Sequence, residues 1–201
     1  MKRVFDITCA VLILVLSAPV LIIVAVLIRR HDGGPVFYVA ERMKTPKQPF
    51  DLIKFRTMSN VEASQNAGVT GGDKSDRITP IGRILRRFRL DELPQAINVL
   101  RGDMSIVGPR PPLRQYTDAF PDLYTCVLRS RPGITGLATL HYHRHEERLI
   151  SRATTPEETE TIYTRRCIPR KAALDLIYQR HASVCFDIVI LWRTIARVLG
   201  R

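Results

Sequence analysis

The chain has 201 residues, and its 31 Lys and Arg against 19 Asp and Glu give a formal net charge of +12. This length allows one globular domain with a real core, but not two once an apolar N-terminus is set aside. The positive charge suits an anionic partner such as acidic lipid headgroups, a phosphorylated substrate or nucleic acid, and does not choose among them. The cysteines lack metal-site or CxxC spacing, which favours a reduced, cytoplasmic domain.

The first predicted element is an apolar helix covering the uncharged segment Ile7 to Ile28. At about 1.5 Å per residue it would reach about 33 Å, enough to cross a bilayer. A cleaved signal peptide is disfavoured, because a long apolar run continues after Pro19. Pro19 removes a backbone hydrogen bond and bends the helix, and Ser17 can satisfy a carbonyl that the bend frees.

Basic residues flank this segment on both sides, at Lys2 and Arg3 and at Arg29 and Arg30. A spanning helix would place one pair on the disfavoured outer face, whereas a bent, re-entrant helix keeps both at the cytoplasmic surface. We therefore expect residues 1–30 to form a re-entrant membrane anchor, with a spanning, proline-kinked helix as the alternative.

Two β-rich runs follow, at residues 36–39 and 50–58, divided by the basic, proline-bearing segment 43–49. They predict a short hairpin. Residues 59–78 are rich in glycine and polar side chains and lack an apolar period, which predicts a mobile loop of the kind that often forms a lid.

Thr79 and Pro80 open an amphipathic helix with one apolar face and several arginines. It either packs on the core with a solvated opposite side or contacts headgroups or phosphates. A second helix is expected from about Asp91 to Leu100, and others from Thr154, over 170–181 and over 184–199. The last one either packs on the core or lies in the membrane interface.

Candidate catalytic groups gather at residues 90–111, where Asp91 and Glu92 begin the second helix. A helix N-terminus favours an ionised aspartate, as a carboxylate nucleophile requires. Glu92 points to another side of the helix and suits a cation-binding or positioning role. Mg²⁺ prefers one or two carboxylates together with substrate phosphates, so both residues are candidate ligands. Ordinary helix-end charge is the alternative.

A cationic set accompanies this acidic pair and predicts phosphate binding. Arg110 and Arg131 each precede a proline in the segments 108–112 and 131–136, which read as stiff turns. Lys54 and Arg56 lie at the end of the hairpin. Such groups can neutralise a diphosphate while a carboxylate attacks it.

Two further patterns are not assigned a function. His141, His143 and His145 alternate, as on one face of a strand, but no cysteine or carboxylate set completes a zinc site. No helix-turn-helix or aromatic-rich binding motif supports nucleic acid as the partner.

The motifs KFRTM at 54–58, LDELPQ at 90–95, NVLRGDMSIVGPRP at 98–111 and RPGITG at 131–136, after an apolar entry with a central proline, resemble the bacterial sugar transferase family. These are the small monotopic phosphoglycosyl transferases, and the chain resembles their minimal catalytic form. Two departures are Ala18, where the family often has serine before the proline, and the segment after Gly136. The second departure leaves substrate contacts there unassigned.

The resemblance implies a two-step enzyme that moves a phospho-sugar from a UDP-sugar to undecaprenyl phosphate and releases UMP. By matching positions, Asp91 is the nucleophile and Glu92 its acidic neighbour at the Mg²⁺ site. Arg110 binds phosphate, and Lys54, Arg56 and Arg131 support it. The implied location is the cytoplasmic face of the bacterial inner membrane.

The expected fold is α+β and mostly helical, with the re-entrant helix, a short hairpin and amphipathic interfacial helices around a cytoplasmic catalytic domain at residues 31–201. Which sugar, pathway and oligomeric state apply is left open. The alternative function is a non-enzymatic, membrane-anchored basic adaptor that binds acidic lipids or polymers.

Overall fold

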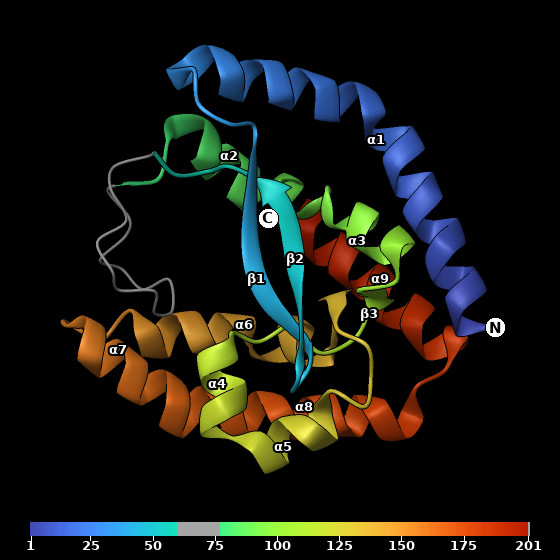
Figure 1. Cartoon of the computed structure of the whole chain (residues 1–201), viewed down its shortest axis with the longest axis vertical. Helices are drawn as coiled ribbons and strands as arrows, with labels where there is room; N and C mark the ends of the chain where they lie inside the picture. Colours follow the sequence, from blue (N-terminus) through green and yellow to red (C-terminus); the bar gives the residue numbers. More distant parts are fainter. Residues whose placement is uncertain (60–76, 201) are drawn as a thin grey trace.

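The computed structural model of the chain describes residues 1–59 and 77–200. Its α-helices and strands, in chain order, are α1 (Lys2–Asp32), β1 (Phe37–Thr45), β2 (Gln48–Phe55), α2 (Pro80–Arg87), α3 (Gln95–Arg101), β3 (Ser105–Val107), α4 (Arg114–Ala119), α5 (Pro121–Val127), β4 (Gly133–Thr135), α6 (Leu137–Ile150), α7 (Pro156–Ile162), α8 (Ile168–His181) and α9 (Val184–Leu199). A 3-10 turn, η2 (Leu90–Glu92), precedes α3, and a π-helical turn, η3 (Tyr163–Cys167), joins α7 to α8. Figure 1 shows the mostly helical α+β fold with a hairpin that the sequence predicts. Most of the predicted loop at 59–78 lies outside the described residues.

The predicted hairpin is confirmed, but β1 is longer than the expected run 36–39, and β2 is shifted to begin before residue 50 and to end before residue 58. β1 and β2 pair antiparallel with Tyr38 opposite Lys54 and Arg42 opposite Phe50. The segment 43–49 was expected to separate the strands, but most of it belongs to them: Met43 pairs with Pro49 and Thr45 with Gln48, with a shift of register between Met43 and Thr45. Alternation places Tyr38, Arg42 and Lys54 on one face of the hairpin.

A second sheet was not predicted. β3 and β4 pair in parallel, with Ser105 opposite Gly133 and Val107 opposite Thr135. The segment 131–136, expected to be only a turn, therefore contains a strand. The backbones approach so closely at this point that a Cβ on Gly108 would lie 2.2 Å from the Arg131 carbonyl oxygen. This pairing fixes the start of the loop that carries Arg110.

The main core lies where α1, β2, α3, β3 and α9 meet. Its buried side chains include Ala10, Leu52, Val99, Ile106 and Ile190. Burial of this kind contributes about 25 cal/mol per Å² of apolar surface, so it is the dominant force holding these elements together.

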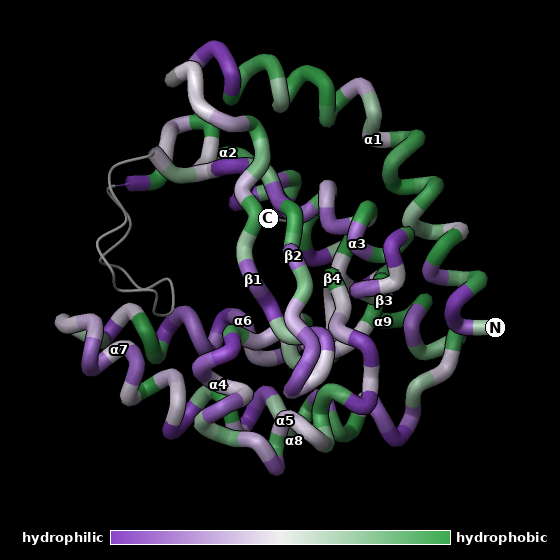
Figure 2. Tube along the Cα trace, in the orientation of Figure 1, coloured by the Kyte–Doolittle hydropathy of each residue, from purple (hydrophilic) through white to green (hydrophobic). Residues whose placement is uncertain are grey.

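Helix α1 is long and apolar and turns partway along its length (Figure 1), and Figure 2 shows that its central part is hydrophobic. Pro19 lies inside the helix, and the Ser17 hydroxyl donates to the Ile13 carbonyl at 2.6 Å. The carbonyl four residues before Pro19 belongs to Val15, so Ser17 bonds a different one. Large side chains in the middle are exposed, including Leu16 at 75% and Ile22 at 65%. By length and composition α1 is the one candidate membrane span in the described part of the chain.

The N-terminal end of α1 is attached to the domain by a polar network of Lys2, Asp6, Ser105, Tyr178 and Asp187. The Lys2 ammonium contacts an Asp187 oxygen at 2.5 Å and the Tyr178 hydroxyl at 3.0 Å. Tyr178 donates to Asp187 at 2.6 Å. Asp6 accepts from the Ser105 hydroxyl at 2.9 Å and from the Ile106 amide at 3.0 Å. We call these five residues the N-terminal network.

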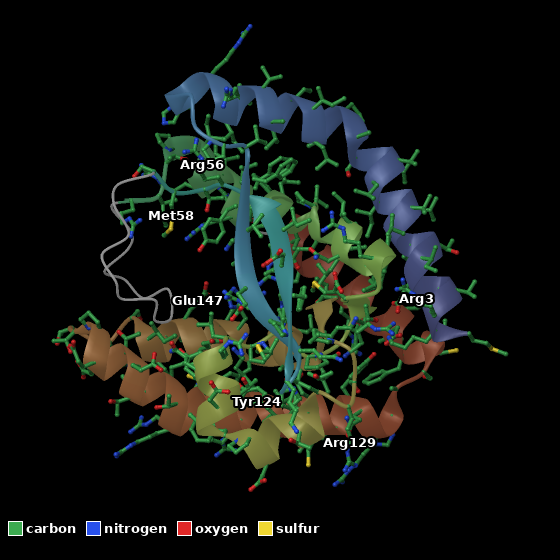
Figure 3. All side chains as sticks on the ribbon, in the orientation of Figure 1. Arg3, Arg56, Met58, Tyr124, Arg129 and Glu147 are labelled. Carbon is green, nitrogen blue, oxygen red and sulfur yellow. The ribbon has the colours of Figure 1, made fainter. Side chains whose placement is uncertain are left out.

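The C-terminal end of α1 packs on the same domain. Val24 and Ile28 are buried in a small core with Phe55 of β2 and Leu85 of α2. Figure 3 labels Arg3, which lies at the N-terminal end of α1, and Arg56, which lies below the other end of the helix. Both ends of α1 therefore pack on one folded body, whereas Val15, Leu16, Pro19 and Val20 in the middle are exposed.

Helix starts predicted from capping residues are confirmed. The Thr79 hydroxyl accepts from the Gly82 amide, and Thr155 accepts from the Glu158 amide. Ser183 caps α9 in the same way. One face of α9 packs on the core through Ile190, while Trp192 is 71% exposed with other apolar side chains beside it. The opposite face of α9 is therefore apolar and exposed, as the face of an interfacial membrane helix would be.

Candidate active site

The acidic pair lies in η2 rather than at the start of a long helix. Pro94 is the N-cap of α3, so the prediction that a helix begins near Asp91 is wrong. The preceding Arg89 has φ 55°, a left-handed conformation rare for arginine that costs on the order of 1–2 kcal/mol. This turn lets the chain reverse after α2 and brings the Arg89 guanidinium 3.2 Å from a Glu92 oxygen.

Glu92 is held between two arginines. Both terminal nitrogens of Arg110 donate to one Glu92 oxygen at 3.1 Å, and Arg89 donates to the other. Burial favours the neutral acid, but Arg110 and Arg89 outweigh it and lower the pKa of Glu92. Glu92 is therefore an anion that orients Arg110, whose side chain remains 46% exposed and open to a ligand.

Asp91 differs from its neighbour. It is 8% exposed, and no other side chain donates a hydrogen bond to its carboxylate within residues 1–59 and 77–200. Burial and the charge of Glu92 raise the pKa of Asp91, while Lys54 and Arg86 oppose this rise. The helix-end argument predicts the opposite direction, and it fails because burial dominates here. A more basic, unengaged carboxylate is a better nucleophile.

Lys54 lies on β2 beside this pair. Burial, together with the charges of Arg110, Arg86 and Arg42 and opposed by Asp91, lowers the pKa of Lys54 to about 8. Its ammonium lies 5.3 Å from the centre of the Tyr38 ring. The lowered pKa therefore reflects burial first and the three nearby arginines second.

Two further arginines belong to this group. Arg86 of α2 donates from Nε to the Thr57 hydroxyl at 2.9 Å, and its positive charge is attracted to the carboxylate of Asp91. The sequence places it only among the charges of an amphipathic helix. Arg42 of β1 was not singled out, although the alternation that puts Lys54 on one hairpin face puts Arg42 there too.

The structure does not bring Arg56 or Arg131 to Asp91. Arg56 is buried beneath the end of α1, where it lines a small pocket with Ile28 and His31. The Arg131 side chain is exposed, and within the described ranges it makes no hydrogen bond or ion pair. Their predicted supporting roles remain untested.

The three alternating histidines lie on helix α6, not on a strand. The alternation of three histidines is too short to indicate a strand, and the helix that contains them begins at Leu137. His143 faces Glu147 at 3.3 Å, and burial together with Arg89 and Arg110 lowers its pKa against the pull of Glu147 and Glu146. It lines a small pocket with Arg89, Thr139 and Arg197. The segment after Gly136 thus lies beside the residues that hold Glu92.

The residues at the acidic pair fit a magnesium ion in one respect. Two carboxylates with phosphate ligands match the preference of Mg²⁺ for oxygen. No group of three or more His, Cys, Asp or Glu side chains suited to a metal occurs among the residues that the structure describes. A metal at Asp91 and Glu92 would therefore need the substrate's phosphates as further ligands.

Comparison with known proteins agrees with these features. A family model described as bacterial sugar transferase matches residues 1–201. The chain is 38% identical over 98% of its length to an undecaprenyl-phosphate glucose phosphotransferase of Komagataeibacter xylinus, but spans only 35% of that protein. It is 34% identical to the exopolysaccharide production protein ExoY of Sinorhizobium fredii, of which it covers 84%.

A third relative is a UDP-glucose:undecaprenyl-phosphate glucose-1-phosphate transferase of Caulobacter vibrioides, 37% identical over 98% of this chain and 69% of that protein. The match of the family model over the whole chain is the broadest of these findings. The chain belongs to the bacterial sugar transferase family.

Proposed function

We propose that the protein transfers a phospho-sugar from a UDP-sugar to undecaprenyl phosphate, giving undecaprenyl-diphosphate sugar and UMP, as a first membrane step of polysaccharide synthesis. The observation that carries this proposal is the buried Asp91, to which no described side chain donates a hydrogen bond, among cations that outnumber the acids. The names of the relatives supply the substrate classes.

In the first step Asp91 attacks the sugar-bearing phosphorus of the donor. The new bond joins an Asp91 oxygen to phosphorus, the bond from that phosphorus to the bridging oxygen breaks, and its electron pair leaves on UMP. In the second step an oxygen of undecaprenyl phosphate attacks the same phosphorus and frees the Asp91 carboxylate. No proton has to move in either exchange, so catalysis is mostly positioning and charge stabilisation.

Glu92 supports this chemistry by fixing Arg110. An arginine fork matches the oxygens of a phosphate, and two hydrogen bonds to one Glu92 oxygen orient the fork before substrate arrives. We further propose that Asp91 and Glu92 hold Mg²⁺ together with the donor diphosphate. The ion would neutralise charge on the phosphates.

Helix α1 supports a re-entrant anchor. Its two ends contact the same domain through the N-terminal network and through Val24 and Ile28, whereas the exposed middle is apolar. A straight spanning helix would carry one end about 30 Å from the domain. We propose that residues 1–30 dip into the cytoplasmic leaflet and return, with the exposed faces of α2 and α9 at the interface and residues 31–201 in the cytoplasm.

A UDP-sugar panel tests the activity. Protein in nanodiscs with Mg²⁺, undecaprenyl phosphate and each UDP-sugar should release UMP with at least one donor, and a membrane-anchored basic adaptor would release none. The adaptor would instead show salt-sensitive binding to acidic vesicles that tolerates Asp91→Asn.

Cysteine accessibility tests the topology. Tags at residue 1 and at residue 201 should both be cytoplasmic, and a periplasmic residue 1 would establish a spanning helix.

A further inference from the structure

Arg42 is a cation for which no carboxylate partner occurs in the described part of the chain. Its one hydrogen bond, from a terminal nitrogen, goes to the Glu41 backbone carbonyl at 2.9 Å. The Glu41 carboxylate cannot serve it, because Arg114 takes both oxygens from the other face of the strand, at 2.9 and 3.2 Å. Burial and the like charge of Arg110 lower the pKa of Arg42.

The strand that carries Arg42 is bonded to the loop that carries Arg110, because the Met43 amide donates to the Pro112 carbonyl at 3.0 Å, and the two arginines repel each other. A partly buried guanidinium without a counter-charge is costly, and a second one nearby raises the cost. Arg110 has its own carboxylate in Glu92, yet nearly half of its side chain stays exposed. An anion between Arg42 and Arg110 would relieve the repulsion and use the open part of both forks.

The hairpin places Arg42 farther along the strand than Lys54, the hairpin cation that acts on Asp91. Arg42 and Lys54 share one face, but Arg42 pairs with Phe50 while Lys54 pairs with Tyr38. Four residues of strand separate the two pairs, about 13 Å along the strand. The charges of Lys54 and Arg86 lower the pKa of Asp91, whereas the charge of Arg110 lowers the pKa values of both Lys54 and Arg42. The cations therefore run outward from Asp91 through Lys54 and Arg110 to Arg42.

Tyrosines surround the outer end of this series. Tyr38, Tyr116 and Tyr163 lie within electrostatic reach of Arg42. Tyr163 belongs to the π-helical turn η3, a feature common at functional sites, and its ring centre lies 5.1 Å from that of Tyr116. Arginine beside aromatic rings is suited to a phosphate attached to a flat base.

We propose that Arg42 is a further substrate-binding residue which, with Arg110, holds the nucleotide-side phosphate of the donor. This inference rests on the proposed function. When Asp91 attacks the sugar-side phosphorus, the electron pair of the breaking bond goes to an oxygen of this second phosphate, which leaves as part of UMP. Arg42 and Arg110 stabilise the charge that develops there.

Binding of UMP and of uridine to nanodisc-held protein tests the assignment, because the two ligands differ only in the phosphate. The wild type should bind UMP more tightly than uridine. Arg42→Gln should weaken UMP binding about 10- to 100-fold, the value of one or two charge-assisted hydrogen bonds, and leave uridine binding unchanged. The UMP affinity of Arg42→Lys should lie between those of the wild type and Arg42→Gln, because lysine keeps the charge without the fork.

Arg114→Gln is the matched control, an arginine beside the same hairpin whose partner is Glu41, and it should leave both affinities unchanged. Equal UMP affinity in the wild type and both Arg42 variants would overturn the assignment. So would a wild type without preference for UMP over uridine, or variants that lose both ligands equally.

Failure of the proposed function gives a different result. If no UDP-sugar yields UMP but Arg42→Gln still weakens UMP relative to uridine, the phosphate site stands and the transferase activity does not. If the wild type releases UMP and Arg42→Gln changes neither affinity, the activity stands and Arg42 has no role in it. A thermal melt shows whether each variant is folded, and Arg42→Lys carries the test if Arg42→Gln is not.

Discussion

Two clusters of charge in this molecule are built in opposite ways. In the N-terminal network Lys2 contacts Asp187, and one Asp6 oxygen accepts from Ser105 and Ile106, although the other Asp6 oxygen is buried and has no hydrogen bond in the described part of the chain. Around Asp91 the cations outnumber the acids, and no described side chain donates a hydrogen bond to Asp91 itself. This contrast indicates which cluster is structural: the paired charges hold α1 to the domain, and the excess of positive charge near Asp91 awaits an anionic substrate.

The largest expected effect comes from Asp91→Asn. Loss of the nucleophile should reduce UMP release by at least about 10³-fold. The folded protein should be as stable as the wild type or more so at pH 7, because the raised pKa of Asp91 means that its ionised form is disfavoured by folding. Enzyme assay and thermal melting of the same sample measure both. Full turnover would remove Asp91 from the mechanism.

Asp187→Asn should have the opposite effect, a loss of stability rather than a direct loss of the nucleophile. Asp187 is fully buried and is the counter-charge of Lys2, so its loss should cost about 2–4 kcal/mol of stability, less than a fully buried pair because Lys2 is 35% exposed. The midpoint of denaturation in detergent should fall clearly. Glu41→Gln, which breaks an exposed pair with Arg114, is the control and should leave the midpoint nearly unchanged. An unchanged midpoint in Asp187→Asn would mean that the network does not hold α1.

The effects of Glu92→Gln should lie between those of Asp91→Asn and Asp187→Asn, because both turnover and stability should fall. It frees Arg110, so turnover should fall about 10- to 100-fold through a loosened phosphate contact. Because the pKa of Glu92 is lowered in the folded state, its charge adds stability at pH 7, and this is lost as the pH falls below about 4.5. Melting curves should therefore show the variant less stable at pH 7 and equal to the wild type in acid. A constant difference across this range would contradict the ion-pair explanation.

The smallest expected effect concerns the protonation of Lys54. With a pKa of about 8, it is mostly charged at pH 7 and mostly neutral at pH 9. The KM for the donor should rise up to about tenfold over that interval, since one phosphate contact is lost. Lys54→Arg, which stays charged, should flatten this profile. A KM that is independent of pH in the wild type would show that Lys54 does not meet the phosphates.

The sequence predicts features that depend on nearby residues and misses those that depend on distant ones. The Thr79 cap, the hairpin and the apolar α1 are readable because capping and alternation are local signals. The parallel pair of β3 and β4 was missed, because three-residue strands have no period of their own and form only through pairing across the chain.

The site shows the same division. Asp91, Glu92 and Arg110 were found together because one short segment carries them, and Lys54 because its motif marks it. Arg42 was missed, since nothing in its neighbours indicates that the fold leaves it without a carboxylate. Arg56 shares a motif with Lys54, and strand alternation alone would place both on one face. Because β2 ends at Phe55, Arg56 lies beyond the ladder and lines the small pocket under α1 instead.

The most direct test of the central claim, that Asp91 forms a bond to the sugar-bearing phosphate, is single-turnover mass spectrometry. The protein is mixed with Mg²⁺ and a UDP-sugar that supports UMP release, without undecaprenyl phosphate, and is quenched and digested. We expect UMP equal in amount to enzyme and a phospho-sugar adduct on the peptide containing Asp91, both absent in Asp91→Asn. UMP release that requires undecaprenyl phosphate, or an adduct on any other residue, would contradict it.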